Sequence, residues 1–367
     1  MSDVSAVSAF LREHEATPVG LTPTLPTMPD ATEDQDEQPI VDLTIEVKDA
    51  AQWAPILVDE QPPAHSGEFP VRFIDGCQAG QPVLCLSVRG RGWPIPLFLA
   101  EVGAVALRLE GRQFVREFCV VERVLSFVTD PFPWEQVEGF ATALANDAEF
   151  RIRVLPANMP PTGHSLFDYE VMRGQARARV QQEMTNLERL ALAVDRSVPT
   201  LVDGALSRVM GIPDASSPLI IGVVKIQGAT YLHDQGWRTL LGLRPAHRTP
   251  LFRLEGQRGD TGGSFPVATW YLKLAGGPRL APNWGHVRVE VPWGQFLHRG
   301  GTDSGFVNRL SRWLIDARCR TDSYARMPVS LDPIVRAEEA LKPLFTPLPV
   351  LVNRLYRRAG LFRRNEP

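Results

Sequence analysis

The stretch PVRFIDGCQAGQPVLCLSVRG, residues 70–90, contains the pattern on which the fold and chemistry of this chain depend. An apolar run ends in Asp75 with a glycine behind it, and a second apolar run follows. The same pattern returns in VPTLVDGALSRV, residues 198–209, where the carboxylate is Asp203. Asp-Gly is a common turn dipeptide, because glycine tolerates positive φ and aspartate bonds its own backbone. The alternative is a metal site, because two carboxylates from separate strands repel each other unless a hard cation lies between them.

The composition is that of a globular protein. The chain has 367 residues, 44% hydrophobic and 22% charged, enough to bury a sizeable core in one large or two medium domains. No apolar stretch reaches the ~18 residues of a membrane span, and the N-terminus lacks the basic start and apolar core of a secretory signal. The four cysteines show no C-x-x-C spacing, which argues against structural zinc. We therefore expect a cytoplasmic protein without a membrane partner.

Charge is unevenly distributed along the chain. Residues 1–40 hold eight acids and one base, so a charge of −7 there against −3 overall leaves +4 for the rest. These residues are predicted to form a disordered acidic tail, with a short amphipathic piece from Val7 to Leu11. Residues 346–367 contain five arginines and are predicted to form a basic C-terminal helix or tail. A mildly basic body permits nucleic-acid binding without requiring it.

Hydrophobic periodicity predicts a mixed α/β chain without internal repeats. Apolar positions spaced by 3 and 4 residues predict a long helix between residues 165 and 195. The run at 96–111 is apolar without clean periodicity. Strands are predicted at 39–47, 70–76, 82–90, 114–128, 198–206, 218–227, 267–276 and 286–293, and further helices at 305–319 and 332–345.

Three further charged residues accompany the two aspartates. Glu183 and Glu188 flank the apolar stripe of the long helix on opposite sides, so one of them can project toward the end of the sheet; otherwise each is a solvent-facing helix charge. Lys225 ends a nearly pure apolar run. A lysine there either holds a scissile phosphate or steadies the acidic ligands, or it is exposed where the strand emerges.

The ordered set FIDGCQAG, the helix with Glu183 and Glu188, TLVDGAL, IIGVVK, TWYLKL and VRVEVPW resembles the NurA nucleases. The resemblance covers roughly residues 70–340. It implies a DNA-end-processing enzyme with an RNase H-like core, with residues 41–345 as the nuclease domain. It further implies that Asp75, Asp203 and a helical glutamate bind two divalent cations, Mn²⁺ or Mg²⁺. Glu183 is the favoured helical ligand, and Glu188 is the alternative.

The sequence departs from that family in two places. Cys77 and Ala205 stand where serine is usual, and RMPVSLDPIVRAEEAL replaces a segment that normally supplies a histidine. Glu338 is the favoured substitute for this histidine, and Asp332 is another candidate, because a carboxylate is a good ligand for Mn²⁺.

A metal-dependent phosphodiesterase fits these residues better than other hydrolytic chemistry does. Two ions about 4 Å apart can activate a water and stabilise the leaving oxygen together. The sequence has no G-x-S-x-G nucleophile motif and no P-loop, so the chain is not expected to hydrolyse ATP itself.

The leading hypothesis is therefore a metal-dependent deoxyribonuclease that trims DNA ends. By resemblance it acts as a homodimer with a HerA-type hexameric ATPase. The alternative is a catalytically weakened DNA-binding or ATPase-regulating subunit with the same fold, which the missing histidine favours and the two aspartates oppose. A phosphate-ester hydrolase of another family that uses the same carboxylates is a third hypothesis.

Overall fold

The computed structural model describes residues 3–19, 40–58, 68–88, 94–158, 168–225, 231–258, 264–276, 284–300, 304–321, 323–324 and 326–361. The strands are β1 (Thr17–Pro18), β2 (Val41–Asp42), β3 (Ile56–Leu57), β4 (Arg72–Leu86), β5 (Ile95–Glu110), β6 (Gln113–Val128), β7 (Arg153–Ala157), β8 (Thr200–Asp203), β9 (Ile220–Val224), β10 (His247–Arg248), β11 (Phe252–Arg258), β12 (Ser264–Lys273) and β13 (His286–Pro292). The α-helices are α1 (Asp3–Glu13), α2 (Trp134–Ala145), α3 (Asp168–Val194), α4 (Leu206–Val209), α5 (Asp234–Leu241), α6 (Trp293–His298), α7 (Ser304–Asp316), α8 (Asp332–Leu341) and α9 (Leu348–Ala359), and 3₁₀ turns occur at Ala50–Gln52, Met327–Val329 and Lys342–Leu344.

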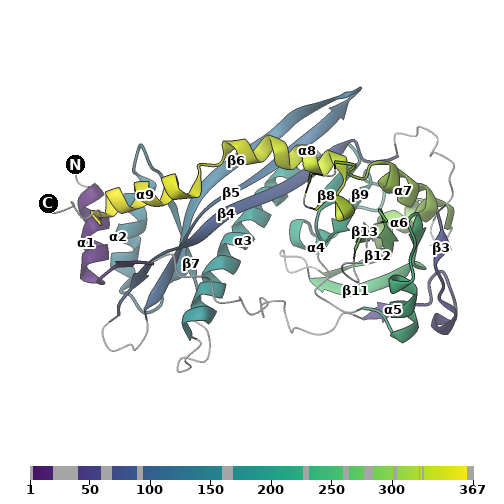
Figure 1. Ribbon diagram of the computed structural model, residues 1–367, viewed down its shortest axis with the longest axis horizontal. Coiled ribbons are helices and arrows are strands. Elements are labelled where there is room, and N and C mark those ends of the chain that lie inside the picture. Colours follow the sequence, from purple (N-terminus) through teal and green to yellow (C-terminus); the bar gives the residue numbers. More distant parts are fainter. Residues whose placement is uncertain are drawn as a thin grey trace.

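One mixed sheet contains all the strands of the described residues, in the order β2-β11-β12-β13-β9-β8-β4-β5-β6-β7, with β1, β3 and β10 paired beside this path. Within it, β4, β5 and β6 are antiparallel neighbours, whereas β8 and β9 run parallel to β4. Figure 1 shows the three long strands crossing the molecule between two groups of helices. The mixed α/β class predicted from the sequence is confirmed, and the order β6-β5-β4-β8-β9 agrees with an RNase H-like core.

The strand β5 explains the apolar run that showed no periodicity. Its residues are buried from Ile95 to Leu107, because α3 covers one face and α8 the other. Ala100, Val102 and Ala104 share a core with Val180 of α3, whereas Val105 and Leu107 pack against α8. A strand buried on both faces needs no alternation of polar and apolar residues.

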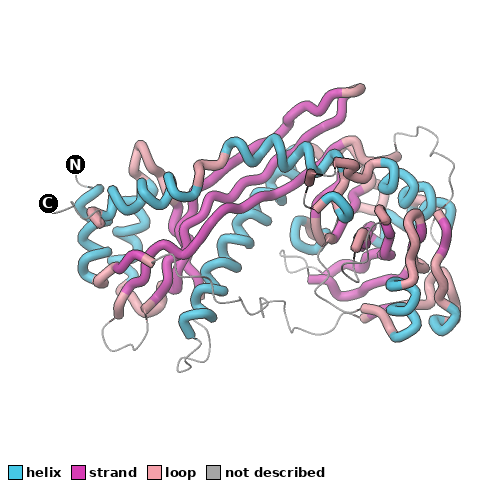
Figure 2. Tube along the Cα trace, viewed as in Figure 1, coloured by secondary structure: helices cyan, strands magenta, loops and turns pink. Residues whose placement is uncertain are grey.

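The strand β4 corrects the prediction of two short strands separated by a turn. It is a single strand of 15 residues that pairs with β5 along its whole length, with one irregularity near Pro82. Figure 2 shows it as an unbroken strand. The dipeptide Asp75-Gly76 therefore lies inside a strand.

The helices α1 and α9 pack together, and α1 contains the predicted amphipathic piece from Val7 to Leu11 but is longer than that piece. Helix α1 contacts α2 and α9, and its side chains Val7, Phe10 and Leu11 are buried with Leu351 and Leu355 of α9. Figure 1 shows α1 and α9 next to each other at one end of the molecule. Residues 20–39 of the predicted tail lie outside the described residues. The predicted C-terminal helix is present as α9.

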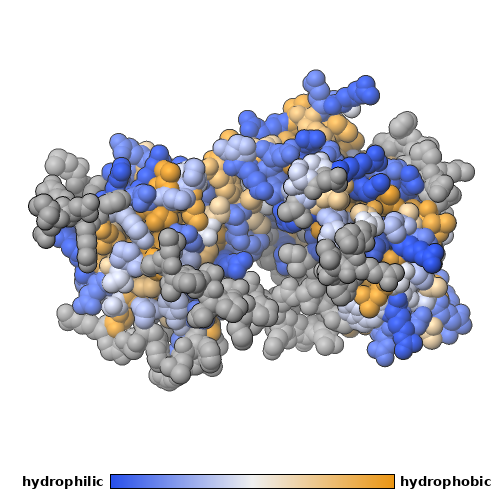
Figure 3. Space-filling view, viewed as in Figure 1, coloured by the Kyte–Doolittle hydropathy of each residue, from blue (hydrophilic) through white to orange (hydrophobic). Residues whose placement is uncertain are grey.

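The β5–β6 hairpin exposes apolar side chains near its end. Val115 of β6 is 41% exposed, and Leu344, which follows α8, is 48% exposed. Figure 3 shows apolar surface along this hairpin below a polar tip. Among the helices of the described ranges, none has the length and apolar content needed to span a membrane.

Candidate active site

The two aspartates singled out in the sequence lie next to each other on parallel strands. Ile74 of β4 pairs with Val202 of β8, so Asp75 and Asp203 occupy the next position on each strand. Strand β8 ends at Asp203, whereas β4 continues. Asp75 is 5% exposed. The expected arrangement on neighbouring strands is confirmed, and the turn interpretation applies to Asp203-Gly204 alone.

Gly76 has no side chain, which allows Glu188 of α3 to approach strand β4 closely. A Cβ atom on Gly76 would lie 2.4 Å from Oε1 of Glu188, which is closer than real Cβ contacts. The backbone N–H of Gly76 donates a hydrogen bond to the Glu188 carboxylate. The glycine is therefore required by the close approach of Glu188 and not by a turn.

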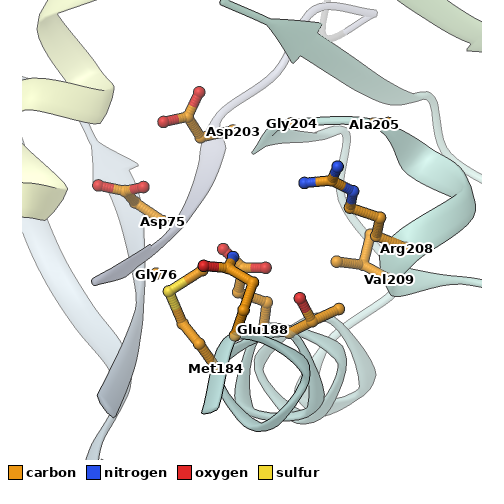
Figure 4. Close-up of a pocket in the computed structure, with 11 residues that line it drawn as sticks. Asp75, Gly76, Met184, Glu188, Asp203, Gly204, Ala205, Arg208 and Val209 are labelled. Carbon is orange, nitrogen blue, oxygen red and sulfur yellow. The ribbon is translucent and has the colours of Figure 1, made fainter. Parts of the chain in front are cut away.

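The carboxylates approach the end of β8 from both faces of the sheet. Asp75 pairs with Val105, and directly paired residues point to the same side. Because Val105 packs on α8, Asp75 is directed toward α8, and Gly76 faces α3. Figure 4 shows Asp75 and Asp203 projecting in the same direction, with Glu188 below them on α3.

A cavity of about 130 Å³ lies at this point. It is lined by Asp75, Gly76, Gln181, Met184, Thr185, Glu188, Asp203, Gly204, Ala205, Arg208 and Val209. Its polar atoms come from β4, α3 and the turn after β8. In Figure 4 the guanidinium of Arg208 reaches toward the cavity from the side opposite β4.

The carboxylates of the site have unusual proton affinity. Burial, followed by the neighbouring charge of Asp203, raises the pKa of Glu188 to about 8. Burial and the charge of Asp203 also raise the pKa of Asp75 well above its ordinary value, while Lys225 opposes the shift. Low solvation and like charges both favour the protonated form.

Lys225 lies where the sequence placed it, directly after β9. Its Nζ donates to Oδ2 of Asp203 at 2.7 Å, and its side chain is only 7% exposed. The lysine therefore offsets part of the negative charge and fixes the orientation of the Asp203 carboxylate. The alternative of an exposed lysine is wrong.

Glu338 of α8 faces the same region, as its expected role requires. It is buried, and its charge contributes to the raised pKa of Asp75. Its carboxylate accepts hydrogen bonds from the Tyr324 hydroxyl and, at 3.0 Å, from Arg326, and it pairs with Lys342 at 2.6 Å. These partners, the Lys342 and Tyr324 hydrogen bonds first, outweigh burial and lower the pKa of Glu338.

Two candidate ligands lie outside the cavity. Glu183 pairs with Arg153 of β7 and lies 3.6 Å from Arg179, so the structure corrects the preference for Glu183 over Glu188. The two glutamates are five residues apart on α3 and therefore project in different directions. Asp332 is in the first turn of α8 and lies 3.7 Å from Arg336, with 42% of its side chain exposed. It is not among the residues that line the cavity.

Cys77, the residue where serine is usual, lies two positions beyond Asp75 on the same side of β4. Burial, followed by the charge of Asp75, raises the pKa of its thiol. A thiol held in its neutral form is a poor ligand for a hard cation. Ala205 lines the cavity and offers no side-chain oxygen.

Sequence reasoning missed two residues near the site. Arg208, five residues after Asp203, lines the cavity, but an arginine in a short polar stretch gives no periodic or motif signal. Tyr324 contacts Glu338. Tyr324 lies two residues before the substituted segment RMPVSLDPIVRAEEAL, and a single tyrosine there gives no motif signal.

The donor set fits a hard divalent cation by its chemistry. The ligands available are carboxylate oxygens, which Mg²⁺ and Mn²⁺ prefer. The raised pKa values of Asp75 and Glu188 reflect burial first and then neighbouring negative charge, which a cation would compensate. In the part of the chain that the structure describes, no group of three or more His, Cys, Asp or Glu side chains lies close enough together to hold a metal ion as it stands. The carboxylates surround the end of β8 from two faces.

The fold and the site together define a mixed α/β protein with an acidic cavity where the parallel strand β8 ends beside β4. No protein-family profile matches the chain, and no curated protein matches it. Among solved structures, the crystal structure of the NurA nuclease from Sulfolobus solfataricus is similar, with a TM-score of 0.45 and 12% sequence identity. The match covers 89% of this chain and 93% of that one. At this identity and score, membership of the NurA family does not follow from the match.

Proposed function

We propose that this chain is a divalent-metal-dependent nuclease that hydrolyses phosphodiester bonds of DNA. The observation that supports this proposal is the placement of Asp75 and Asp203 in register on adjacent parallel strands. Glu188 and Glu338 lie within electrostatic reach of Asp75. Buried carboxylates gathered in this way are unfavourable without a cation, and strand ends are where open α/β sheets bind ligands.

The chain's own residues supply positioning and charge. Asp75 and Asp203, with Glu188 or Glu338, would hold the cations. Two bound Mn²⁺ or Mg²⁺ ions would activate a water and stabilise the leaving oxygen. The Lys225 ammonium holds one oxygen of Asp203 in place, and the Gly76 N–H holds Glu188. Burial of Asp75 keeps bulk water from competing at its carboxylate.

The resemblance of the sequence motifs to NurA nucleases extends this proposal. It suggests DNA ends as substrate, a HerA-type hexameric ATPase as partner, a homodimer as the assembly and a cytoplasmic location. Co-purification with such an ATPase, and mass measurement by light scattering, test the two assembly proposals independently of catalysis.

A specific contact favours the second candidate, a catalytically weakened DNA-binding or ATPase-regulating subunit. Glu338, the favoured substitute for the histidine of that family, is already paired with Arg326 and Lys342. A carboxylate neutralised by two cations is a weaker metal ligand than a free one. In that case the chain would bind DNA and cleave it slowly or not at all.

The experiment that tests the nuclease proposal uses Asp203→Asn. Purified protein is incubated with end-labelled linear DNA and Mn²⁺ or Mg²⁺, with EDTA as the metal-free reaction. We expect Asp203→Asn to reduce cleavage by about 10³-fold or more, because asparagine keeps the shape but loses the charge that binds the cation. Circular dichroism and the melting temperature establish that the variant is folded.

The matched control is Asp332→Asn, which makes the same substitution at an exposed position of α8. It should leave cleavage unchanged. Wild-type protein that binds DNA without degrading it would favour the weakened subunit, and full activity of Asp203→Asn would exclude the proposed site.

A further inference from the structure

Arg208 is the cationic side chain that lines the acidic cavity. It belongs to α4, immediately after the turn that follows Asp203. Figure 4 shows its guanidinium extended toward the space between Glu188 and the end of β8. Its charge acts on Glu188 strongly enough to oppose the rise of that residue's pKa.

The backbone that carries Arg208 is held at both ends. The buried carboxylate of Glu290 accepts a hydrogen bond from the Leu206 N–H at 2.9 Å. Arg189 of α3 donates to the Arg208 carbonyl oxygen at 3.3 Å. The guanidinium is thus presented from a fixed main chain, which limits the entropy lost when it binds a ligand.

The other cations near the site already have carboxylate partners. Lys225 pairs with Asp203 at 2.7 Å, and both Arg326 and Lys342 pair with Glu338. Within the described ranges, no carboxylate forms an ion pair with the guanidinium of Arg208. Its charge is therefore the one available in this cavity to an anionic ligand.

We propose that Arg208 binds non-bridging phosphate oxygens of the polynucleotide at the end of β8, and so holds the phosphodiester beside Asp75 and Asp203. This inference rests on the proposed nuclease function and adds a substrate-binding residue to it. A planar guanidinium can donate two parallel hydrogen bonds to one phosphate. An anionic substrate that approaches several carboxylates also needs a positive group to make its entry favourable.

A purely structural role is the rival explanation, in which Arg208 serves only to balance the charge of Glu188. The double variant Glu188→Gln/Arg208→Gln separates the two. If Arg208 acts only through Glu188, its substitution has no further effect once that charge is removed. If it binds phosphate, its substitution weakens phosphate binding in both backgrounds.

The test compares Arg208→Gln and Arg208→Lys with Arg238→Gln, an equivalent change of an exposed arginine in the last turn of α5. Steady-state cleavage of linear DNA, the rise in melting temperature caused by inorganic phosphate with Mg²⁺, and Mn²⁺ affinity by calorimetry are measured. We expect kcat/KM of Arg208→Gln to fall about 10- to 100-fold, with partial recovery in Arg208→Lys and no change in Arg238→Gln. The phosphate effect should be lost in Arg208→Gln. Its Mn²⁺ affinity should be equal or higher, because a cation has been removed.

Each other outcome has one meaning. Wild-type kinetics and an intact phosphate effect in Arg208→Gln would overturn the inference. A lowered Mn²⁺ affinity together with a lowered melting temperature would also overturn it, because the turn would then have been displaced. A third outcome is that the wild-type protein does not cleave DNA, phosphate raises its melting temperature, and phosphate has no such effect on Arg208→Gln. In that case the proposed nuclease function fails, while the phosphate-binding role of Arg208 stands.

Discussion

Asp75-Gly76 lies inside the long strand β4, whereas Asp203-Gly204 ends β8 and begins the turn to α4. Gly76 has extended backbone geometry, and a Cβ there would collide with Glu188. Gly204 has φ +122° and nothing within 4 Å of its Cβ position. One glycine is required by a neighbour and the other by its own backbone.

Whether an Asp-Gly dipeptide lies in a strand or in a turn therefore depends on the element that packs beside it. Strand β5 pairs with β4 through both residues of Asp75-Gly76, and this pairing keeps the backbone extended. Strand β8 ends at Asp203. The two carboxylates reach the same place although their local structures differ.

Among the variants that test the difference between the two glycines, Gly76→Ala is expected to have the largest effect on stability and cleavage. The new methyl group must displace the buried Glu188 carboxylate, so we expect a loss of about 1–3 kcal/mol in the free energy of unfolding and loss of metal-dependent cleavage. Urea denaturation and the linear-DNA assay measure the two effects.

The second substitution Glu188→Ala supplies the control. It should restore much of the stability of Gly76→Ala, because it removes the atoms that collide, but it should not restore cleavage. Gly204→Ala is expected to cost about 1–3 kcal/mol through backbone strain, and Glu188→Ala should not relieve it. Equal rescue of both glycine variants would contradict the distinction.

The close approach of Glu188 to Gly76 can also be tested by the pH dependence of the free energy of unfolding. The pKa of Glu188 rises from an ordinary 4.5 to about 8 on folding, so the folded state keeps a proton that the unfolded chain releases between these pH values. The free energy of unfolding should therefore decrease as pH rises through this window, by about 1.4 kcal/mol for each pKa unit at most. Asp75 acts in the same direction.

Urea denaturation in the presence of EDTA, repeated across this pH window, measures the slope of the free energy of unfolding against pH. Glu188→Gln should flatten it, and Mg²⁺ or Mn²⁺ should reduce it in the wild-type protein, because a bound cation favours the ionised carboxylate. Identical slopes in the wild-type protein and Glu188→Gln would show that Glu188 does not retain its proton in the folded state.

A smaller effect is expected on the opposite face of β4. Glu338→Gln should weaken Mn²⁺ affinity severalfold and slow cleavage, since it removes a buried carboxylate beside Asp75. Glu339→Gln should do little, because Glu339 is exposed and pairs with Arg336. Calorimetry with Mn²⁺ compares the two, and negligible effects from both would mean that Asp75, Asp203 and Glu188 suffice.

The fold was predictable where periodicity was strong. The spacing along α3 and the apolar runs of β8 and β9 gave those elements directly, and the antiparallel pair β12–β13 followed from alternation. The continuity of β4 and the strand character of β5 were not predictable. Both depend on helices that cover two faces of the sheet, which is a tertiary effect that overrides local turn signals.

The site was half predictable for a similar reason. Asp75 and Asp203 could be predicted as site residues because each follows an apolar run, and such runs form neighbouring strands in a mixed sheet. The choice between Glu183 and Glu188 depends on the rotation of α3 about its axis, which the apolar stripe leaves open when glutamates flank it on both sides. Arg208 carried no signal, because its importance comes only from the turn that brings it to the cavity.

The contact between α1 and α9 has a consequence for synthesis of the chain. Ser8 donates a hydrogen bond to the Arg358 carbonyl oxygen, and Phe10 stacks on Phe140 of α2. During translation the first helix leaves the ribosome with its apolar side uncovered, and α2 can cover it only after more than a third of the chain has been made. The other partner, α9, follows much later in the chain than α2. The apolar side of α1 therefore stays partly uncovered until both partners have been made, and the packing of α1 on α9 cannot precede synthesis of the strands that lie between them in the chain.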